Sequence, residues 1–177
     1  LHLSIRRQRQ MCIRDSSFDG SSYMKAAKVL GAMRSEIAML TSANQHNEAS
    51  SWASAPQKNF GRLISYERTV LGLRPLKLEE KLSASATGHS GDMARIGFFS
   101  HTSPVPGKKT FSDRARKAGF QGGPSGECIA AGQGSFSSAY QSWFYSDGHR
   151  HIMLAKGPSV LGFGVVSKHW TLVTGRR

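Results

Sequence analysis

Three residues able to carry acid–base or metal chemistry stand at separate points of the chain: His101, Glu127 and His149. His101 follows Phe98 and Phe99 and lies in the polar run Ser-His-Thr-Ser-Pro. This run cannot continue a helix or a strand cleanly, and the two phenylalanines are expected to be anchored in a core. His101 is therefore expected at the end of a rigid element, facing a groove.

Two neutral imidazoles and one carboxylate are suitable ligands for Zn²⁺ or another divalent cation. With three protein ligands, an open position would remain for a water that the metal activates for hydrolysis. His101, Glu127 and His149 are thus candidate catalytic residues and candidate metal ligands. These three residues lie far apart in the sequence, whereas the ligands of a His-Glu-x-x-His motif lie within one helix. Their spacing alone therefore does not indicate a metal site. The alternative is a hydrogen-bonded polar cluster in which Glu127 holds the histidines.

Nucleophilic catalysis has less support in the sequence. Ser100, Ser103 and Ser146 flank the histidines, as a Ser–His nucleophile would require, but there is no Gly-x-Ser-x-Gly elbow. Cys128 follows Glu127 directly, and both the carboxylate and burial would raise the pKa of its thiol. Cys128 is therefore predicted to be a small buried residue.

Two further groups have structural interpretations. His89 lies on the inner stripe of a predicted helix, which favours a buried, hydrogen-bonded histidine over a metal ligand. Arg114, Arg116 and Lys117 come at the end of a short predicted helix, where cations interact favourably with the helix dipole.

The elements that must position these residues follow from hydrophobic periodicity and turn signals. Helices are predicted over 24–40, 60–71, 78–96, 111–118, 135–144 and 149–155, and a hairpin of strands over 160–166 and 169–174. Residues 127–131 are predicted to start a strand, and Thr110-x-x-Asp113 fits a helix capping box. Gly162 and Gly164, inside a strand, indicate close packing of a neighbour. Helices followed by short strands predict an α+β fold with helices covering a small sheet.

The N-terminal third is organised differently. Residues 1–16 have no periodicity and are interpreted as a non-native, adaptor-derived segment. The helix over 24–40 has an apolar stripe of Ala26, Leu30, Met33, Ile37 and Leu40. Residues 41–59 are rich in Ser, Ala and Asn and are interpreted as a linker. We therefore expect an N-terminal helix and linker over 17–59 and one domain over 60–177.

The composition limits the classes of function. The chain has a formal net charge of +13, and residues 60–177 carry 16 Lys and Arg against 7 Asp and Glu. These charges are scattered without interleaved aromatics, so a solvated basic surface is favoured over nucleic-acid binding. No apolar run approaches the roughly 20 residues of a membrane span. The basic segment after Met24 is interrupted by Arg34 and Glu36, so it is not interpreted as a signal peptide. Without the first 16 residues Cys128 is the one cysteine, which excludes an internal disulfide.

Several short motifs occur together and in a fixed order. They are Leu73-Arg-Pro-Leu-Lys-Leu, Gly88-His-Ser-Gly-Asp-Met, Gly97-Phe-Phe-Ser-His-Thr-Ser-Pro, Phe111-x-Asp-Arg-Ala, Gly126-Glu, Ala139-x-x-x-Trp and Gly148-His-Arg. Over residues 60–174 this pattern resembles the bacterial branch of the CAP superfamily, the SCP-like extracellular domains related to cysteine-rich secretory proteins, antigen 5 and plant pathogenesis-related proteins.

The resemblance implies an α-β-α sandwich with a small central antiparallel sheet and a groove that carries two histidines and two acidic residues. By motif, the histidines fall on His101 and His149, and one acid falls on Glu127. The nearest candidate for the second acid is Asp147, in a loop that differs from the family's. Cys128 stands where the family usually has asparagine, which puts a hydrogen bond near the groove in doubt.

The resemblance also implies a location and a choice of functions. The chain is expected to be secreted or in the cell envelope, and to be a monomer. The favoured function is a binding module for a lipid, glycan or peptide of the cell envelope, or for a metal ion. The alternative is a metal-assisted, protease-like hydrolase that uses His101, Glu127 and His149. The family has no shared established activity, so its fold does not decide between them.

Overall fold

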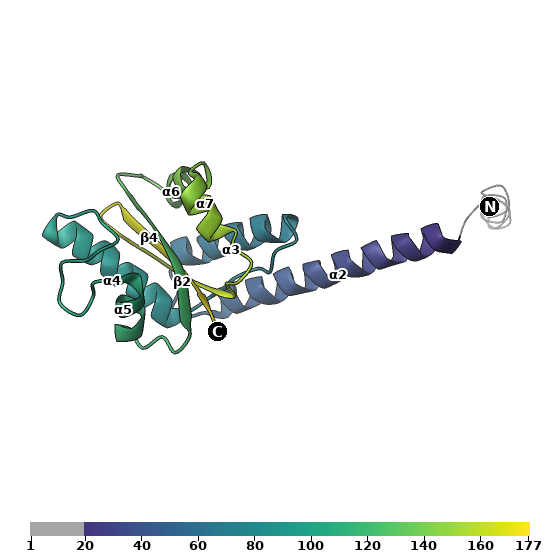
Figure 1. Cartoon of the computed structure of the whole chain (residues 1–177), viewed down its shortest axis with the longest axis horizontal. Helices are drawn as coiled ribbons and strands as arrows, with labels where there is room; N and C mark the ends of the chain where they lie inside the picture. The colour runs from purple at the N-terminus through teal and green to yellow at the C-terminus, as the bar shows by residue number, and fades with distance from the viewer. Residues whose placement is uncertain (1–19) are drawn as a thin grey trace. The chain divides into compact units, whose positions relative to one another are not determined.

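The computed structural model describes residues 20–177, and the segment interpreted as adaptor-derived lies outside them. Within residues 38–177 the frame is a four-stranded sheet in the order β1-β3-β4-β2 (Figure 1). Its strands are β1 (Lys77–Leu78), β2 (Gly123–Ala131), β3 (Val160–Val166) and β4 (His169–Arg176). β2, β4 and β3 pair antiparallel, whereas β1 pairs parallel to β3. The predicted α+β fold is confirmed, with a two-residue parallel strand added at one edge of the antiparallel sheet.

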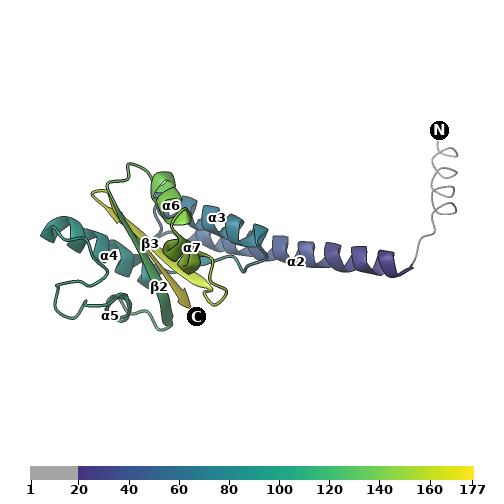
Figure 2. The same ribbon diagram turned by 45° about the horizontal axis from the view of Figure 1, so that its top comes forward.

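Helices cover both faces of this sheet, as the second view shows most clearly (Figure 2). One face carries α4 (Glu80–Ile96) and α5 (Phe111–Lys117); the other carries α3 (Ala55–Val70), α6 (Phe136–Phe144) and α7 (Asp147–Met153). The core is accordingly divided in two. A small cluster under α4 and α5 comprises Leu82, Ala86, Ala115, Phe120, Val160 and Val173. A larger, aromatic cluster on the other face includes Phe60, whose ring stacks 4.2 Å from that of Phe163.

Helix α4 lies directly on the backbone of β3. A Cβ atom added at Gly162 would collide with the backbone of Leu82, and one at Gly164 with the backbone of Thr87. The close packing predicted from these two glycines is confirmed. Helix α4 is thus packed closely on the sheet, and the chain that carries His101 leaves from its C-terminal end.

Local signals in the sequence define several boundaries correctly. Gly97 ends α4 in the left-handed conformation, with φ of 80°. Thr110 and Asp113 form the predicted capping box at the start of α5. Ser167 and Lys168 make the hairpin turn with φ of 46° and 62°, the backbone that a tight two-residue hairpin requires.

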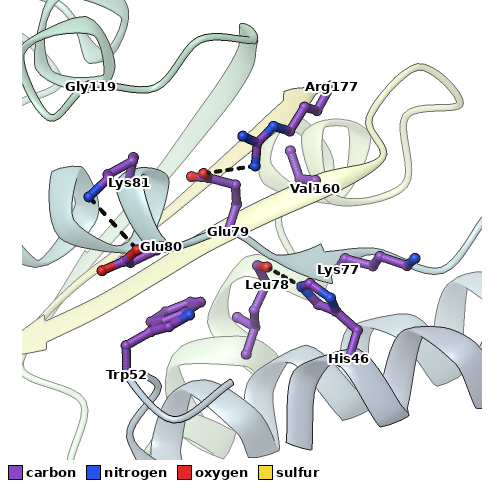
Figure 3. Close-up of a pocket in the computed structure, with 10 residues that line it drawn as sticks. All are labelled: His46, Trp52, Lys77, Leu78, Glu79, Glu80, Lys81, Gly119, Val160 and Arg177. Atoms are coloured by element: carbon purple, nitrogen blue, oxygen red, sulfur yellow. Dashed lines mark hydrogen bonds and ion pairs between the residues drawn. The ribbon is translucent and has the colours of Figure 1, made fainter. Parts of the chain in front are cut away.

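Helix α2 (Gly20–Ala49) corrects the linker prediction, because residues 41–49 are helical. Its last turns have tertiary partners: the side-chain oxygen of Asn47 accepts a hydrogen bond from the Leu78 amide at 2.7 Å. His46 Nε2 donates to the Leu78 carbonyl at 3.0 Å (Figure 3). The outer edge of β1 is thus bonded to side chains of α2. The division of the chain into domains at residue 59 stays a prediction.

The earlier part of α2 has a different character. The predicted helix is present, but its apolar side chains are exposed: Met24 by 67%, Leu30 by 57%, Met33 by 51% and Ile37 by 60%. Within residues 20–177, none of the helices combines the length and apolar content of a bilayer span.

Candidate functional site

His101 lies in the loop that leaves the C-terminal end of α4, and its side chain is 53% exposed. The ring of Phe98, just before it, lies 5.8 Å from the ring of His89 and is half-buried. Phe99 is 55% exposed. The prediction that both phenylalanines are anchored in a core is therefore wrong for Phe99. Phe98 alone therefore packs inward at the start of the loop, after Gly97 has ended α4.

Glu127 lies in the middle of β2, opposite Val173 of β4, and its side chain is 1% exposed. One carboxylate oxygen bonds His101 Nδ1 at 2.8 Å, and the other accepts from Arg114 Nη2 at 2.6 Å. A carboxylate paired with a guanidinium is an acceptor only, so His101 Nδ1 must carry a proton. In the neutral imidazole, Nε2 then keeps a free lone pair.

Arg114 lies in the last turn of α5, as the sequence predicts, but it does not belong to the solvated basic surface expected there. The residue is buried, with 3% of its surface exposed. Besides Glu127, it donates from Nη1 to the carbonyls of His101, Lys108 and Lys109 at 3.2, 3.0 and 3.2 Å. The signal was present in the sequence, because Arg114 follows Phe111 by three positions and so lies on the inward face of α5. Arg114 therefore fixes both the buried carboxylate and the loop that carries His101.

His149 lies in the first turns of α7 and is half-buried. Its Nδ1 hydrogen-bonds the hydroxyl of Ser146 at 2.9 Å. Burial, and secondarily the charge of His101, lower the pKa of His149 below its ordinary value. The second imidazole is thus held neutral, close enough to His101 to sense its charge.

Cys128 and Asp147 flank this arrangement. Cys128 is buried, and the pKa of its thiol is raised first by burial and then by Glu127, so the predicted inert cysteine is confirmed. Its sulfur lies 3.8 Å from the carbonyl of His149. The side chain of Asp147 is 91% exposed and forms an ion pair with Arg150. The structure therefore brings His101 and Glu127 into contact, whereas the Asp147 carboxylate pairs with Arg150.

His89 is completely buried on the inner face of α4. Its Nε2 bonds the carbonyl of Ser100 at 3.1 Å, whereas its Nδ1 has no hydrogen-bond partner in the described part of the chain. Burial is the main cause that lowers the pKa of His89. The predicted core histidine is thus present, with one of its two nitrogens unpaired.

The predicted donors do not converge on one point. Among residues 20–177, no group of three or more His, Cys, Asp and Glu side chains is arranged to hold a metal. Both oxygens of Glu127 are already bonded, to His101 and Arg114. The three-ligand set predicted for Zn²⁺ does not fit this arrangement, and the donors that remain are the Nε2 atoms of His101 and His149.

A hollow of about 400 Å³ lies at the start of α4, near the end of β4 (Figure 3). Its rim carries Trp52, Glu80 and Lys81, with the ion pair of Glu79 and Arg177 beside them. None of the candidate site residues lines it, so it is separate from the His101 site.

Comparison with known proteins supplies the context of this geometry. Residues 62–172 match the model of the cysteine-rich secretory protein family, CAP. An uncharacterized protein of Bacillus subtilis (strain 168), YkwD, is 35% identical over 130 residues, which are 72% of this chain and 50% of that protein. The uncharacterized membrane protein YlbC of the same organism is 31% identical over 115 residues, 65% of this chain and 33% of that protein.

Solved structures agree. An extracellular protein containing an SCP domain from Bacillus anthracis superposes with a TM-score of 0.66 at 31% identity, over 69% of this chain and 40% of that one. An outer surface protein of Borrelia burgdorferi gives 0.60 at 18% identity, over 68% of this chain and 91% of that one, a likeness of fold alone. The chain spans half or less of the length of the curated relatives it matches.

Proposed function

Because this chain belongs to the cysteine-rich secretory protein (CAP) family, we propose that it is an extracytoplasmic binding module for a glycan or peptide of the cell envelope. The ligand is held at His101 and His149. Support for the location comes from the Bacillus anthracis relative, which is described as extracellular. The fold itself does not determine the ligand, so the proposal rests on the geometry of the two imidazoles.

One observation carries the proposal: Glu127 is buried and fully bonded, while the ring of His101 that it holds is half-exposed. Glu127 thus acts as a positioning residue. It fixes the orientation of the imidazole and leaves Nε2 as an acceptor at the surface. An imidazole nitrogen with a lone pair accepts hydrogen bonds from hydroxyl and amide donors, and glycans and peptides carry many of these groups.

His149 supplies the second contact in this proposal. Its lowered pKa, caused mainly by burial, favours the neutral imidazole at neutral pH. The bond between its Nδ1 and Ser146 leaves Nε2 unassigned to any partner within the described residues. Two imidazoles, oriented by a carboxylate and a hydroxyl, form a site that binds through hydrogen bonds.

The second candidate function is a metal-assisted hydrolase. The contact that favours it is also the one between Glu127 and His101, because carboxylates commonly orient histidines that bind metals. With Glu127 occupied by Arg114, such a site would have two imidazole ligands and would take the others from solvent or from the bound molecule. That donor set is poorer than the three protein ligands of typical catalytic zinc sites.

Calorimetric titration with soluble glycan–peptide fragments of bacterial cell wall tests the binding module. We expect binding by the wild type and a loss of about tenfold or more in His101→Ala and His149→Ala, as for removal of a central hydrogen-bonding contact. His151→Ala, an exposed histidine of the same helix as His149, is the matched control and should bind normally. Equal binding by all four proteins, or none by the wild type, would contradict the proposal.

A parallel Zn²⁺ titration separates the two candidate functions. The binding module predicts no tight site for zinc. One-site binding at micromolar or lower Kd, lost in both His101→Ala and His149→Ala, would instead support the hydrolase and justify assays of peptide cleavage.

A further inference from the structure

A small cavity is lined by Arg114 but not by Glu127. It has a volume of about 140 Å³ and lies between α4 and α5. Its lining is formed by Ala84, Ser85, Gly88, His89, Lys108, Arg114, Lys117 and Ala118. The cavity does not include His101, Glu127 or His149, and the proposed binding of envelope polymers makes no use of it.

Three of the lining side chains have buried polar atoms without a hydrogen-bond partner in the described part of the chain. These atoms are Ser85 Oγ, His89 Nδ1 and Arg114 Nε. All three residues are 5% exposed or less. A buried polar atom without a partner costs about 1–3 kcal/mol, and such atoms are few in native proteins. Because three such atoms belong to residues that line one cavity, we infer that a bound ligand supplies the missing hydrogen-bond partners.

The charges of the lining indicate an anionic guest. Lys108, Arg114 and Lys117 line the cavity, and no carboxylate does. Lys108 and Arg114 are paired with Asp92 and Glu127, which lie outside the lining. Lys117 forms no ion pair with any residue of the described chain, so it adds an uncompensated positive charge. Arginine and lysine side chains together are the usual partners of oxyanions.

His89 narrows the class of anion further. Its Nε2 faces a carbonyl oxygen, that of Ser100, and so must donate. In the neutral imidazole, Nδ1 is then an acceptor. Arg114 Nε–H is a donor, and the hydroxyl of Ser85 can act as either. The cavity therefore suits an anionic ligand that has oxygen atoms to accept hydrogen bonds and one O–H group to donate one.

We propose that this cavity binds a phosphate group that keeps a proton, as inorganic phosphate or as the terminal group of a phosphomonoester. Arg114 Nε and Ser85 Oγ donate to its oxygens, its P–OH donates to His89 Nδ1, and Lys117 contributes charge. The volume exceeds the roughly 30 Å³ of one water several-fold, which is enough for a tetrahedral oxyanion. Because sulfate has no proton at neutral pH, it cannot satisfy His89, and the site should discriminate against it.

The test is calorimetric titration of the full chain with phosphate, glycerol 3-phosphate and sulfate at neutral pH. We expect phosphate to bind at one site and sulfate to bind about tenfold more weakly or worse, because the acceptor of His89 would face another acceptor. Binding of glycerol 3-phosphate as well would identify phosphomonoesters as the source, and its failure would identify free phosphate. Equal affinity for sulfate and phosphate, or no binding of phosphate, would overturn the proposal.

Two variants and a matched control locate the site. Ser85→Ala removes one donor and should weaken phosphate binding about five- to tenfold. Lys117→Gln should weaken it about threefold or more through loss of charge. Arg116→Gln also removes one positive charge from α5, but Arg116 does not line the cavity. The Arg116→Gln variant should therefore bind phosphate like the wild type. If all three variants bind phosphate like the wild type, the anion is bound elsewhere on the basic surface and the proposal fails. All three variants leave His101 and His149 unchanged, so this result is independent of the test of envelope binding.

Discussion

The two sides of Arg114 differ in how completely their polar atoms are paired. On the side of Glu127, both nitrogens of the guanidinium fork are bonded, to the carboxylate and to three carbonyls. On the side of α4, Arg114 Nε, His89 Nδ1 and Ser85 Oγ have no partner within residues 20–177. Glu127 on the first side and His89 and Ser85 on the second are all 5% exposed or less. On the paired side, the chain itself supplies the hydrogen-bond partners, which stabilise the fold and position His101. On the unpaired side, the partners are supplied only by a bound ligand, which we propose to be phosphate.

Removing the guanidinium is expected to have the largest effect on stability. Arg114→Met leaves the Glu127 carboxylate buried without its cation and removes one donor from each of three carbonyls, of which only that of Lys109 keeps another within the described chain, the Ser103 amide. Loss of one partner of a buried ion pair costs about 3–5 kcal/mol, to be measured as the free energy of unfolding in urea. Arg116→Met, exposed on the same helix, should change it by about 0.5 kcal/mol or less. A loss below about 1 kcal/mol in Arg114→Met would show that the paired side does not stabilise the fold.

Lowering the pH is expected to have the next largest effect on stability, through two histidines that are wholly or partly buried. Burial lowers the pKa of both His89 and His149 from the ordinary value of 6.5. The unfolded chain therefore binds protons at a higher pH than the folded chain. The free energy of unfolding is therefore highest above about pH 6.5. It falls as the pH drops below this value, by up to about 1.4 kcal/mol per pH unit for each histidine.

Urea unfolding between neutral pH and about pH 5 measures this slope. His89, the more buried, should contribute more of it than His149. His149→Gln should reduce the slope, and the exposed His151→Gln should not. A slope that is unchanged in His149→Gln would remove the argument that this imidazole is held neutral.

Two buried serines of α4 allow a direct comparison of a hydrogen-bonded hydroxyl, that of Ser90, with an unpaired one, that of Ser85. The expected effects on stability are smaller than those above. The hydroxyl of Ser90 bonds Thr171 Oγ1 at 2.9 Å and the carbonyl of Gly164 at 3.3 Å. Ser90→Ala leaves both without this partner, and the expected loss of stability is about 1–2 kcal/mol. Thermal unfolding in phosphate-free buffer would show it as a lower Tm, and an unchanged Tm would contradict it.

Ser85→Ala should have the smallest effect in the same buffer. Because the Ser85 hydroxyl has no partner in the described residues, its removal should change stability by about 0.5 kcal/mol or less, and in the stabilising direction if at all. Added phosphate should raise the Tm of the wild type more than that of Ser85→Ala. Similar losses in Ser85→Ala and Ser90→Ala would erase the distinction between paired and unpaired serines.

Much of the frame was predictable because it depends on neighbours in sequence. Gly97 ends α4, Thr110 and Asp113 cap α5, and Ser167-Lys168 make the hairpin turn. Each of these features involves residues within one turn of one another, where side-chain type and spacing carry the information. Such signals set where each element begins and ends.

The features that were missed depend on partners far along the chain. The sequence predicts the position of Arg114 at a helix end but not its burial, because its partner Glu127 reaches it only through the pairing of β2 with β4. Residues 41–49 resemble a linker in composition, but Asn47 bonds Leu78, and tertiary contacts override weak local preference. The contact of His101 with Glu127 was anticipated from family resemblance, since nothing in the spacing of the two residues predicts it.

The last turns of α2 also determine how the sheet meets other chains. A bare strand edge is a template on which an extended segment of another molecule can add by backbone pairing. At β1, the amide group of Asn47 and the ring of His46 take the place of a neighbouring strand along Leu78. Polymerisation through this edge is thereby blocked in the intact chain. A fragment that starts at residue 60 would lose the block, so protein made in that form should be prone to self-association.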